Sequence, residues 1–280
     1  PPSYTATFPI TGEQLREIFC TNINKCKSPS LEECENVANL INKYSDLFEI
    51  NTALRMAHFL GQVGWESNNL KAMGKKSGEG TCYNQKSTGW EKIWFKSTWK
   101  ELPFNYTGCP EAPPNNKKPR KNKNHWTDIS EVPKKYICDG GEVVADTAGK
   151  NLFNYVYRCE GGNGDEASGD GFRYRGHGIM QLTWKKQYVA FEAWLQLKGF
   201  PKDFNKILTN PDEGFKNLEL DILSGMWYWD RGNCNGTADK IQSGSTRDEF
   251  DKITKKINDG LLDSDKRKEI FEKSYSILKK

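Results

Sequence analysis

The sequence predicts a mainly helical protein, with one domain over residues 1–280 and a small sheet or long hairpin. Apolar residues recur at helical spacing in much of the chain, and several of these segments begin with a capping pattern. Alternating strand patterns are few, and no internal repeat is present. A chain of this length can bury a substantial core, and its 9 Trp and 14 Phe argue against disorder.

Three helices are expected near the N-terminus. Capping boxes at Thr11–Gln14 and Ser30–Glu33 precede the first two, because the side chains at their ends can bond to free backbone N–H groups. Asn51 can cap the third helix. The apolar stripe of this third helix runs directly into Trp65 and Glu66.

Residues 103–135 differ from the rest of the chain, because they are rich in Pro, Asn and Lys and show no helical period. We expect a basic insertion loop within the domain. Between Pro113 and Lys135, 7 basic residues stand against 2 acidic ones. The loop is therefore either a solvated surface segment or a basic arm that meets an anionic polymer surface.

Helical spacing returns in the second half of the chain. Apolar residues indicate five further helices, around residues 152–156, 188–195, 218–229, 250–257 and 270–278. The best alternating pattern runs from Phe172 to Leu182 and is punctuated by glycines. This pattern predicts the strand or hairpin.

The charge, hydropathy and motif content exclude several classes of protein. A net charge of +4 does not indicate a nucleic-acid partner. No apolar run approaches the ~18 residues of a membrane helix, so no membrane span is expected. His58 and His177 lie far apart and no H-E-x-x-H motif occurs. Neither a metal site nor a cofactor is therefore expected.

The eight Cys lie at scattered positions and include no C-x-x-C pair. This argues against a zinc ribbon or a thioredoxin-like motif. An even number of Cys favours disulfides in an oxidising compartment, and hence a secreted or periplasmic protein. Reduced, buried thiols are the alternative, and the pairing does not follow from the sequence.

Glu66 is the leading candidate for chemistry. It follows an apolar helix and sits beside Trp65. A carboxyl in an apolar pocket loses hydration, which favours its protonated form, and a protonated carboxyl can serve as a general acid near neutral pH. A surface Glu at a helix end is the plainer alternative.

A second carboxylate could activate water, because glycoside cleavage uses two carboxyls in unlike environments. Glu79 lies on a Gly-flanked turn shortly after the candidate acid, and Glu166 and Asp170 are rivals. The segment Arg173–Thr183, which includes Tyr174, mixes Gly, polar and aromatic residues. This mixture suits either a sugar-binding groove or a tight turn of the hairpin.

Four blocks of sequence carry a resemblance to a known family. They are Ala57–Ser67 (AHFLGQVGWES), Gly162–Thr183 (GNGDEASGDGFRYRGHGIMQLT), Trp227–Trp229 with Cys234–Asp239, and Ile253–Gly260 (ITKKINDG) followed by Arg267. The blocks occur in the family's order. On these residues the chain resembles glycoside hydrolase family 19, the chitinase and phage-endolysin group.

The resemblance implies a lysozyme-like, two-lobed helical fold with a central cleft. It also implies inverting hydrolysis of β-1,4 bonds next to N-acetylglucosamine-type sugars. By position, it implies Glu66 as the general acid, Glu79 as the base and Thr183 as a hydroxyl that helps to hold the attacking water. The implied substrate-binding positions are Gln181, Gln187, Tyr188, Asn258 and Arg267.

The chain departs from the family pattern at three places. Trp65 stands where the family has His before the acid, and Asp259 stands in place of a Gly. Residues 74–163 carry a long, basic insertion that contains Cys.

The expected function is a secreted glycosidase of the lysozyme or endolysin type, which cleaves β-1,4 bonds in peptidoglycan glycan strands. The second block is like that of bacterial and phage members, and a basic insertion suits an anionic cell wall. The alternatives are a chitinase, a catalytically inactive module that binds glycans or inhibits enzymes, and a lytic transglycosylase. If the enzyme is an antibacterial toxin, its producer needs an immunity protein as a partner.

Overall fold

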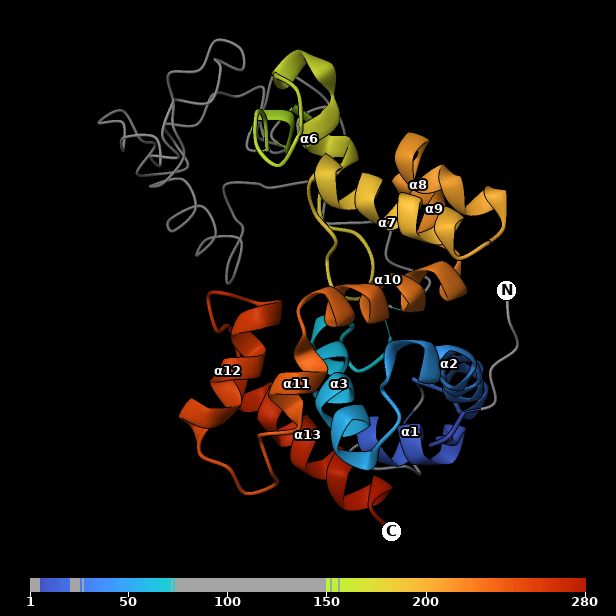
Figure 1. Cartoon of the computed structure of the whole chain (residues 1–280), viewed down its shortest axis with the longest axis vertical. Coiled ribbons are helices and arrows are strands. Elements are labelled where there is room, and N and C mark those ends of the chain that lie inside the picture. The colour runs from blue at the N-terminus through green and yellow to red at the C-terminus, as the bar shows by residue number, and fades with distance from the viewer. Residues whose placement is uncertain are drawn as a thin grey trace. The chain divides into compact units, whose positions relative to one another are not determined.

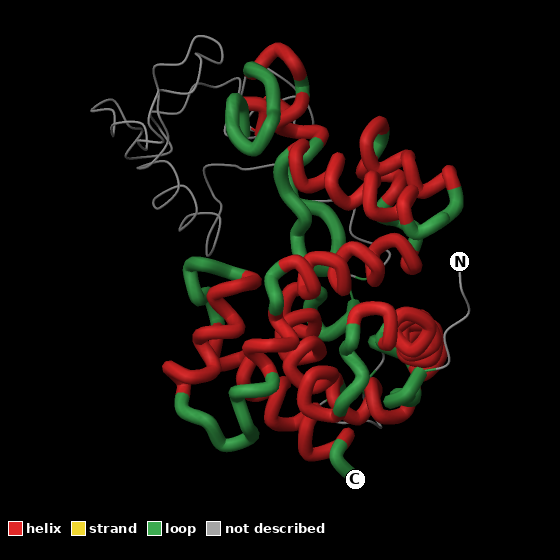
Figure 2. Tube along the Cα trace, in the orientation of Figure 1, coloured by secondary structure: helices red, strands yellow, loops and turns green. Residues whose placement is uncertain are grey.

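The computed structural model describes residues 6–20, 26, 28–71, 73, 150–151, 153–155 and 157–280. Within these residues the chain is built of helices joined by turns and loops (Figure 2). The mainly helical class predicted from the sequence is therefore confirmed.

Contacts between Cα atoms divide the chain into two compact units. The first unit comprises Pro1–Ser77, His177–Leu182 and Phe191–Lys280, and the second comprises Gly78–Gly176 and Thr183–Ala190. The single domain over residues 1–280 and the two-lobed cleft stay predictions. The insertion loop 103–135 lies outside the described residues.

The first unit opens with two helices that begin as the sequence predicts (Figure 1). α1 (Gly12–Phe19) and α2 (Leu31–Tyr44) both start with complete capping boxes. The hydroxyls of Thr11 and Ser30 each accept a hydrogen bond of 3.1 Å from a backbone N–H of the first turn. Both predicted helices are confirmed.

α3 (Ala53–Glu66) is the third predicted helix, and its cap is Thr52, one residue after the predicted cap Asn51. The Thr52 hydroxyl accepts from the Arg55 N–H at 3.2 Å. All nine residues from Met56 to Gly64 are buried. A helix that is buried on every side is a core element, so α3 is the centre of the first unit.

α13 (Ser264–Leu278) packs along α3 (Figure 1). Two glycines of α3 permit close approach to its neighbours. A Cβ at Gly61 would lie 3.0 Å from the backbone oxygen of Arg267, and a Cβ at Gly64 would lie 2.4 Å from a ring carbon of Phe19. The close contact at Gly61 therefore sets the position of α13 against α3, and the close contact at Gly64 sets that of α1.

Helices follow in the second half of the chain at the predicted segments. α7 (Lys185–Leu197) passes from the second unit into the first. The other helices that the structure describes in the first unit are η1 (Asp46–Phe48), η5 (Lys202–Asn205), α8 (Lys206–Thr209), α9 (Pro211–Gly214), α10 (Leu218–Arg231), α11 (Cys234–Ala238) and α12 (Arg247–Ile257). Near 152–156, residues 153–155 are helical.

The strand predicted over Phe172–Leu182 is not found. α6 (Asp170–Arg173), which follows η4 (Glu166–Ser168) in the second unit, occupies its first part. Residues 177–182 form a tight turn with one isolated bridge. Polar side chains of this segment are buried, so the alternation of polarity does not reflect an alternation of burial. The small sheet or hairpin is therefore not confirmed.

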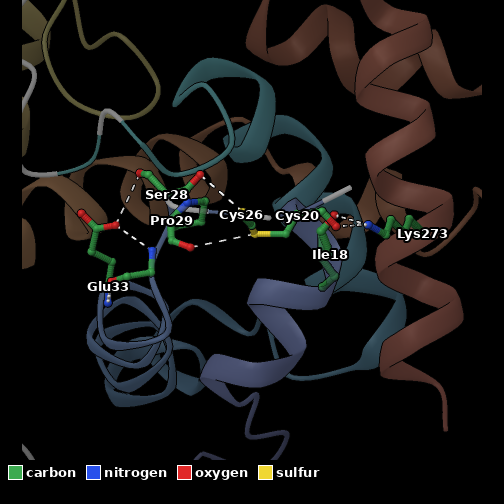
Figure 3. Close-up of a disulfide and its surroundings, with 8 residues drawn as sticks. Ile18, Cys20, Cys26, Ser28, Pro29, Glu33 and Lys273 are labelled. Carbon is green, nitrogen blue, oxygen red and sulfur yellow. Dashed lines mark hydrogen bonds between the residues drawn. A yellow bond between two sulfur atoms is a disulfide. The ribbon is translucent and has the colours of Figure 1, made fainter. Parts of the chain in front are cut away.

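A disulfide follows α1, between Cys20 and Cys26 (Figure 3). Next to it, the Lys273 ammonium of α13 donates to the backbone oxygens of Ile18 at 2.8 Å and Cys20 at 3.3 Å. A cation at the C-terminal end of α1 complements the partial negative charge of the helix end. Lys273 therefore holds the end of α1 against α13, and the disulfide ties the residue after this helix to Cys26.

The other described cysteines include both a disulfide-bonded residue and the reduced, buried thiols that were the alternative expectation. Cys159 is disulfide-bonded, whereas Cys34 and Cys234 are free and buried. Burial raises the pKa of the Cys34 thiol to about 11 and that of Cys234 to about 12. These two thiols therefore behave as apolar core groups. Among the described residues, no helix has the length and apolar character that a membrane crossing requires.

Candidate active site

Glu66 lies in the last turn of α3, where this helix leaves the core. Its side chain keeps 17% of its surface exposed, in contrast to the buried residues of the preceding turns. Trp65 beside it is 37% exposed. Glu66 is thus a half-buried carboxyl at a helix end, within reach of solvent.

Arg267, near the start of α13, binds the carboxylate of Glu66. Its Nη2 donates to Glu66 Oε1 at 2.6 Å, while its own side chain is 1% exposed. Nη1 donates to Gln62 Oε1 at 3.0 Å, and Nε donates to the backbone oxygen of Leu262 at 3.1 Å. A planar guanidinium with partners in three directions cannot rotate, so Arg267 holds Glu66 Oε1 in one place.

Helix geometry explains why Gln62 and Glu66 meet the same partner. They lie four residues apart on α3, so their side chains share one face of the helix. Gln62 is fully buried and Glu66 lies at the rim. The guanidinium of Arg267 therefore spans from the core to the edge of the first unit.

The surroundings of Glu66 differ from the apolar pocket that Trp65 led us to expect. The partner of the carboxylate is a charged guanidinium, and Oε2 receives no hydrogen bond from the described part of the chain. One oxygen is thus fixed, and the other has no partner among the described residues. A carboxyl arranged in this way can meet a substrate atom and exchange a proton with it.

Asn258 ends α12 on the connection that leads to α13. Its N–H donates to the backbone oxygen of Thr254 at 2.7 Å. The same connection supplies the Leu262 oxygen that Arg267 binds, so Asn258 and Arg267 belong to one folded segment. Asp259, which replaces a Gly of the family pattern, is exposed and does not have a positive φ. The backbone at this position therefore does not need a glycine.

Gln181 lies on the tight turn 177–182 of the first unit. The ends of this turn exchange backbone hydrogen bonds of 3.0 and 2.7 Å, and the Ile179 N–H donates to the Asp221 carboxylate of α10 at 2.7 Å. Gln181 has a φ of 52°, and its amide donates to the Gly178 oxygen at 3.0 Å. The turn is therefore a rigid support for Gln181.

Four of the predicted site residues that the structure describes belong to the second unit. Tyr174 and Tyr188 are buried there, with ring centroids 5.2 Å apart, and the Tyr188 hydroxyl donates to the Arg175 oxygen at 2.6 Å. Thr183 and Gln187 are half-buried. The two tyrosines thus help to form the core of this unit. The sugar-binding roles of Tyr174, Gln187 and Tyr188 and the water-holding role of Thr183 stay predictions.

The candidate bases have different surroundings. Glu79 lies outside the described residues. Asp170 is buried, and its Oδ2 accepts from the Gly164 N–H at 3.1 Å and from the Lys185 ammonium at 3.0 Å. Asp170 therefore stabilises its own loop, whereas Glu166 is half-buried at the start of η4. Of the two alternatives to Glu79, Asp170 is therefore the less suitable candidate for the catalytic base.

His58 has a structural environment. Its Nε2 lies 2.8 Å from the Ile241 oxygen, and its ring stacks on Phe271 with centroids 3.8 Å apart. Burial lowers the pKa of His58 to about 4, so the ring is neutral at physiological pH. Among the described residues, no group of three or more His, Cys, Asp or Glu side chains could hold a metal ion.

Sequence reasoning missed the polar residues behind Arg267. Gln62 precedes Glu66 by one helical turn, a spacing that could have identified it. Thr254, Ser264 and Asp251 come from α12 and α13, and only the packing of these helices against α3 brings them to Gln62. No local pattern indicates Asp251 or Ser264, and the block Ile253–Gly260, which contains Thr254, gives no sign of its contact with Gln62.

Comparisons with known proteins agree with the earlier resemblance. No family model matches the chain. A protein of Haemophilus influenzae named "Glycosyl hydrolase family 19 domain-containing protein" is 32% identical to it over 154 residues, which cover 54% of this chain and 67% of that protein. Sequence identity of this extent, together with the mainly helical fold, shows that the chain belongs to glycoside hydrolase family 19.

Proposed function

We propose that this chain is a glycosidase that hydrolyses β-1,4 bonds in the glycan strands of peptidoglycan. The observation that supports the proposal best is the pair formed by Glu66 and Arg267. The carboxyl has one oxygen fixed at 2.6 Å from a buried guanidinium, and its other oxygen receives no hydrogen bond from the described residues. This is a suitable arrangement for proton transfer to a sugar oxygen.

In this proposal Glu66 is the general acid. Its Oε2, which Arg267 does not bind, carries the proton to the oxygen of the leaving sugar. Arg267 and Gln62 keep the carboxyl oriented during this transfer. When the proton has left, the carboxylate is stabilised by the charged hydrogen bond from Arg267.

Water completes the reaction by direct displacement. Glu79 acts as the base and Thr183 helps to orient the water, which attacks the anomeric carbon from the face opposite to the leaving group. Inversion of this kind places the two carboxyl groups about 6.5–9.5 Å apart, because a water molecule lies between them. The residues proposed to bind the sugar rings are Tyr174, Gln181, Gln187, Tyr188 and Asn258.

Two features of the sequence favour peptidoglycan over chitin. The block Gly162–Thr183 is like that of bacterial and phage members of the family. The stretch between Pro113 and Lys135 carries 7 basic and 2 acidic residues, which suits an anionic cell wall. Chitin carries no such negative charge.

We further propose that the enzyme acts outside the cytoplasm. The disulfide between Cys20 and Cys26 is compatible with secretion into an oxidising compartment. An enzyme that digests the wall of rival bacteria would be a toxin, and its producer would need an immunity protein as a partner. Genes next to the coding sequence would then include one for a small secreted protein.

The test is a side-by-side assay of the whole chain on purified peptidoglycan and on chitin oligomers. Reducing ends are quantified, and the products are identified by mass spectrometry. The proposal expects hydrolysed peptidoglycan fragments with ordinary reducing ends. Release from chitin alone would make the enzyme a chitinase, and anhydro-sugar ends would make it a transglycosylase. Binding to either polymer without release would identify an inactive glycan-binding module.

A further inference from the structure

A chain of buried hydrogen bonds continues from Arg267 away from Glu66. Gln62 Nε2 donates to Thr254 Oγ1 at 3.1 Å, and the Thr254 and Ser264 hydroxyls lie 3.2 Å apart. The Ser264 hydroxyl donates to the Asp251 carboxylate. Gln62, Thr254 and Ser264 are each 0% exposed. Polar groups that are buried so completely are costly unless every one of them is bonded.

We propose that Thr254, Ser264 and Asp251 are positioning residues that hold Arg267, and through it Glu66, in the orientation required for proton donation. The proposal rests on the function proposed above. None of the three residues contacts Glu66, so each acts through Gln62 and Arg267.

The direction of the hydrogen bonds follows from chemistry. An ionised carboxylate can only accept, so Ser264 donates to Asp251 and must itself accept from Thr254. Thr254 then accepts from the NH₂ end of Gln62, which leaves the oxygen end of this amide for Arg267. A reversed amide would direct NH₂ against the guanidinium. This series of hydrogen bonds therefore holds the Gln62 amide in the one orientation that lets its oxygen accept from Arg267.

Asp251 is the last acceptor in this series of hydrogen bonds, at the end opposite to Arg267. Arg247 Nε donates to its carboxylate at 2.7 Å, and Arg247 also pairs with Asp265. Burial tends to raise the pKa of Asp251, but the hydrogen bonds from Ser264 and Arg247 lower it overall. Asp251 is therefore ionised at neutral pH and remains an acceptor for Ser264.

The hydrogen bonds tie three helices to one carboxyl. Gln62 and Glu66 belong to α3, Thr254 and Asp251 to α12, and Ser264 and Arg267 to α13. Loss of the Thr254 hydroxyl would leave the Gln62 NH₂ buried without its acceptor, and Gln62 would move to find another. Arg267 would then lose one of its three partners. A misplacement of about 1 Å in a catalytic group can cost 10²-fold in rate.

The test compares variants that differ in a single hydroxyl. Thr254→Val removes the hydroxyl at nearly constant volume, and Thr254→Ser restores it. Ser264→Ala removes the next hydroxyl. Ser274→Ala is the matched control, because Ser274 is also 0% exposed on α13 but donates only within its own helix, to the Ile270 oxygen at 2.7 Å.

We expect Thr254→Val and Ser264→Ala to lower kcat by about 10- to 100-fold while KM changes by less than about threefold. Thr254→Ser should recover most of the wild-type kcat, and Ser274→Ala should keep it. A wild-type kcat in Thr254→Val, or an equal loss in Ser274→Ala, would overturn the proposal. All variants are first compared with the wild type by circular dichroism.

A second readout does not depend on activity. The Nε–H resonance of Arg267 and the side-chain NH₂ resonances of Gln62 are followed by NMR in the same variants. We expect Thr254→Val to shift both and Ser274→Ala to shift neither. Unchanged resonances in Thr254→Val would refute the positioning role. If the wild type cleaves no glycan although these shifts occur, only the proposed function fails.

Discussion

Arg267 Nη2 lies 2.6 Å from Glu66 Oε1, and this hydrogen bond joins two residues that are 201 positions apart in the sequence. The guanidinium is buried, whereas the carboxylate stands at the rim of the first unit. A buried cation that is fixed by two further acceptors is a rigid support for a reactive carboxyl. The pair therefore links the stability of the α3–α13 contact to the geometry of the candidate acid.

Arg267→Lys keeps the positive charge but cannot bind Glu66, Gln62 and Leu262 at the same time. We expect kcat to fall by about 10²-fold or more, because the carboxyl is no longer held in one place. The free energy of unfolding should fall by about 2–4 kcal/mol, because buried acceptors lose their donor. Steady-state kinetics and urea unfolding measure the two effects.

Arg55→Lys is the control for this variant. Arg55 lies about three turns before Glu66 on α3 and binds Asp239 through two hydrogen bonds of 2.8 and 2.7 Å. Arg55 and Asp239 form an ion pair at the surface. Weakening this pair should lower the free energy of unfolding by at most about 1 kcal/mol and leave kcat unchanged. If both variants lose activity equally, the effect on Arg267 is not specific to Glu66.

The helices could be predicted from the sequence because local rules determine where they begin. The side chains of Thr11 and Ser30 bond to backbone groups three residues away, and the structure contains both capping boxes. The alternating pattern over Phe172–Leu182 indicates a strand only where polar residues are exposed. Arg175 and His177 do not meet this condition, because Arg175 packs 3.8 Å over the Phe172 ring and His177 binds Asp212 at 3.0 Å.

His58 makes the stability of the first unit sensitive to acid. Burial, the main cause, lowers its pKa to about 4, from a usual value near 6.5. The unfolded chain therefore binds a proton more readily than the folded one, and stability is lost as pH falls from about 6.5 to about 4. The full contribution is about 3 kcal/mol. Urea unfolding between pH 7 and pH 4 measures this loss.

His58→Gln separates this contribution from those of the carboxylates. Glutamine does not titrate and can still donate to the Ile241 oxygen. The variant is less stable at neutral pH because it loses the stacking on Phe271, but its stability should depend less on pH between 6.5 and 4. An identical pH dependence in both proteins would show that His58 does not titrate in this range.

The disulfide Cys20–Cys26 closes a short loop, since its cysteines are six positions apart. Replacing both residues by Ala should lower the free energy of unfolding by about 2 kcal/mol, because the unfolded chain gains conformational freedom. Thermal unfolding under oxidising conditions measures the change. Cys34→Ala, which removes a free buried thiol, should respond to reductant as the wild type does. A double variant with the wild-type Tm would contradict this prediction.

Gly64→Ala tests the packing of α3 against α1. Alanine favours a helix over glycine by about 1 kcal/mol, but the new Cβ would lie 2.4 Å from the buried ring of Phe19. Overpacking of this kind costs about 1–3 kcal/mol, so we expect a net loss of stability. Adding Phe19→Leu should recover part of this loss. If Gly64→Ala alone is more stable than the wild type, Phe19 of α1 does not lie as close to Gly64 as the 2.4 Å distance requires.

The candidate site could be predicted only in part from the sequence. Glu66 and Arg267 were found through blocks that resemble a family, and the structure brings these two residues together. The surroundings of Glu66 were not found, because a neighbouring Trp65 suggested an apolar pocket and the contact with a distant guanidinium has no local signal. Asp251 has no local signal either, and the block that contains Thr254 does not indicate the hydrogen bond from Gln62 to its hydroxyl.

Mass spectrometry of the products of wild type and Glu66→Gln on peptidoglycan addresses the role of the acid. Glutamine has the same shape as glutamate and can still accept a hydrogen bond from Arg267, so the fold and Tm should be retained. It cannot donate the required proton, so fragment release should fall by about 10²–10⁴-fold. Fragment release at the wild-type rate by a folded Glu66→Gln protein would contradict the assignment of Glu66 as the general acid.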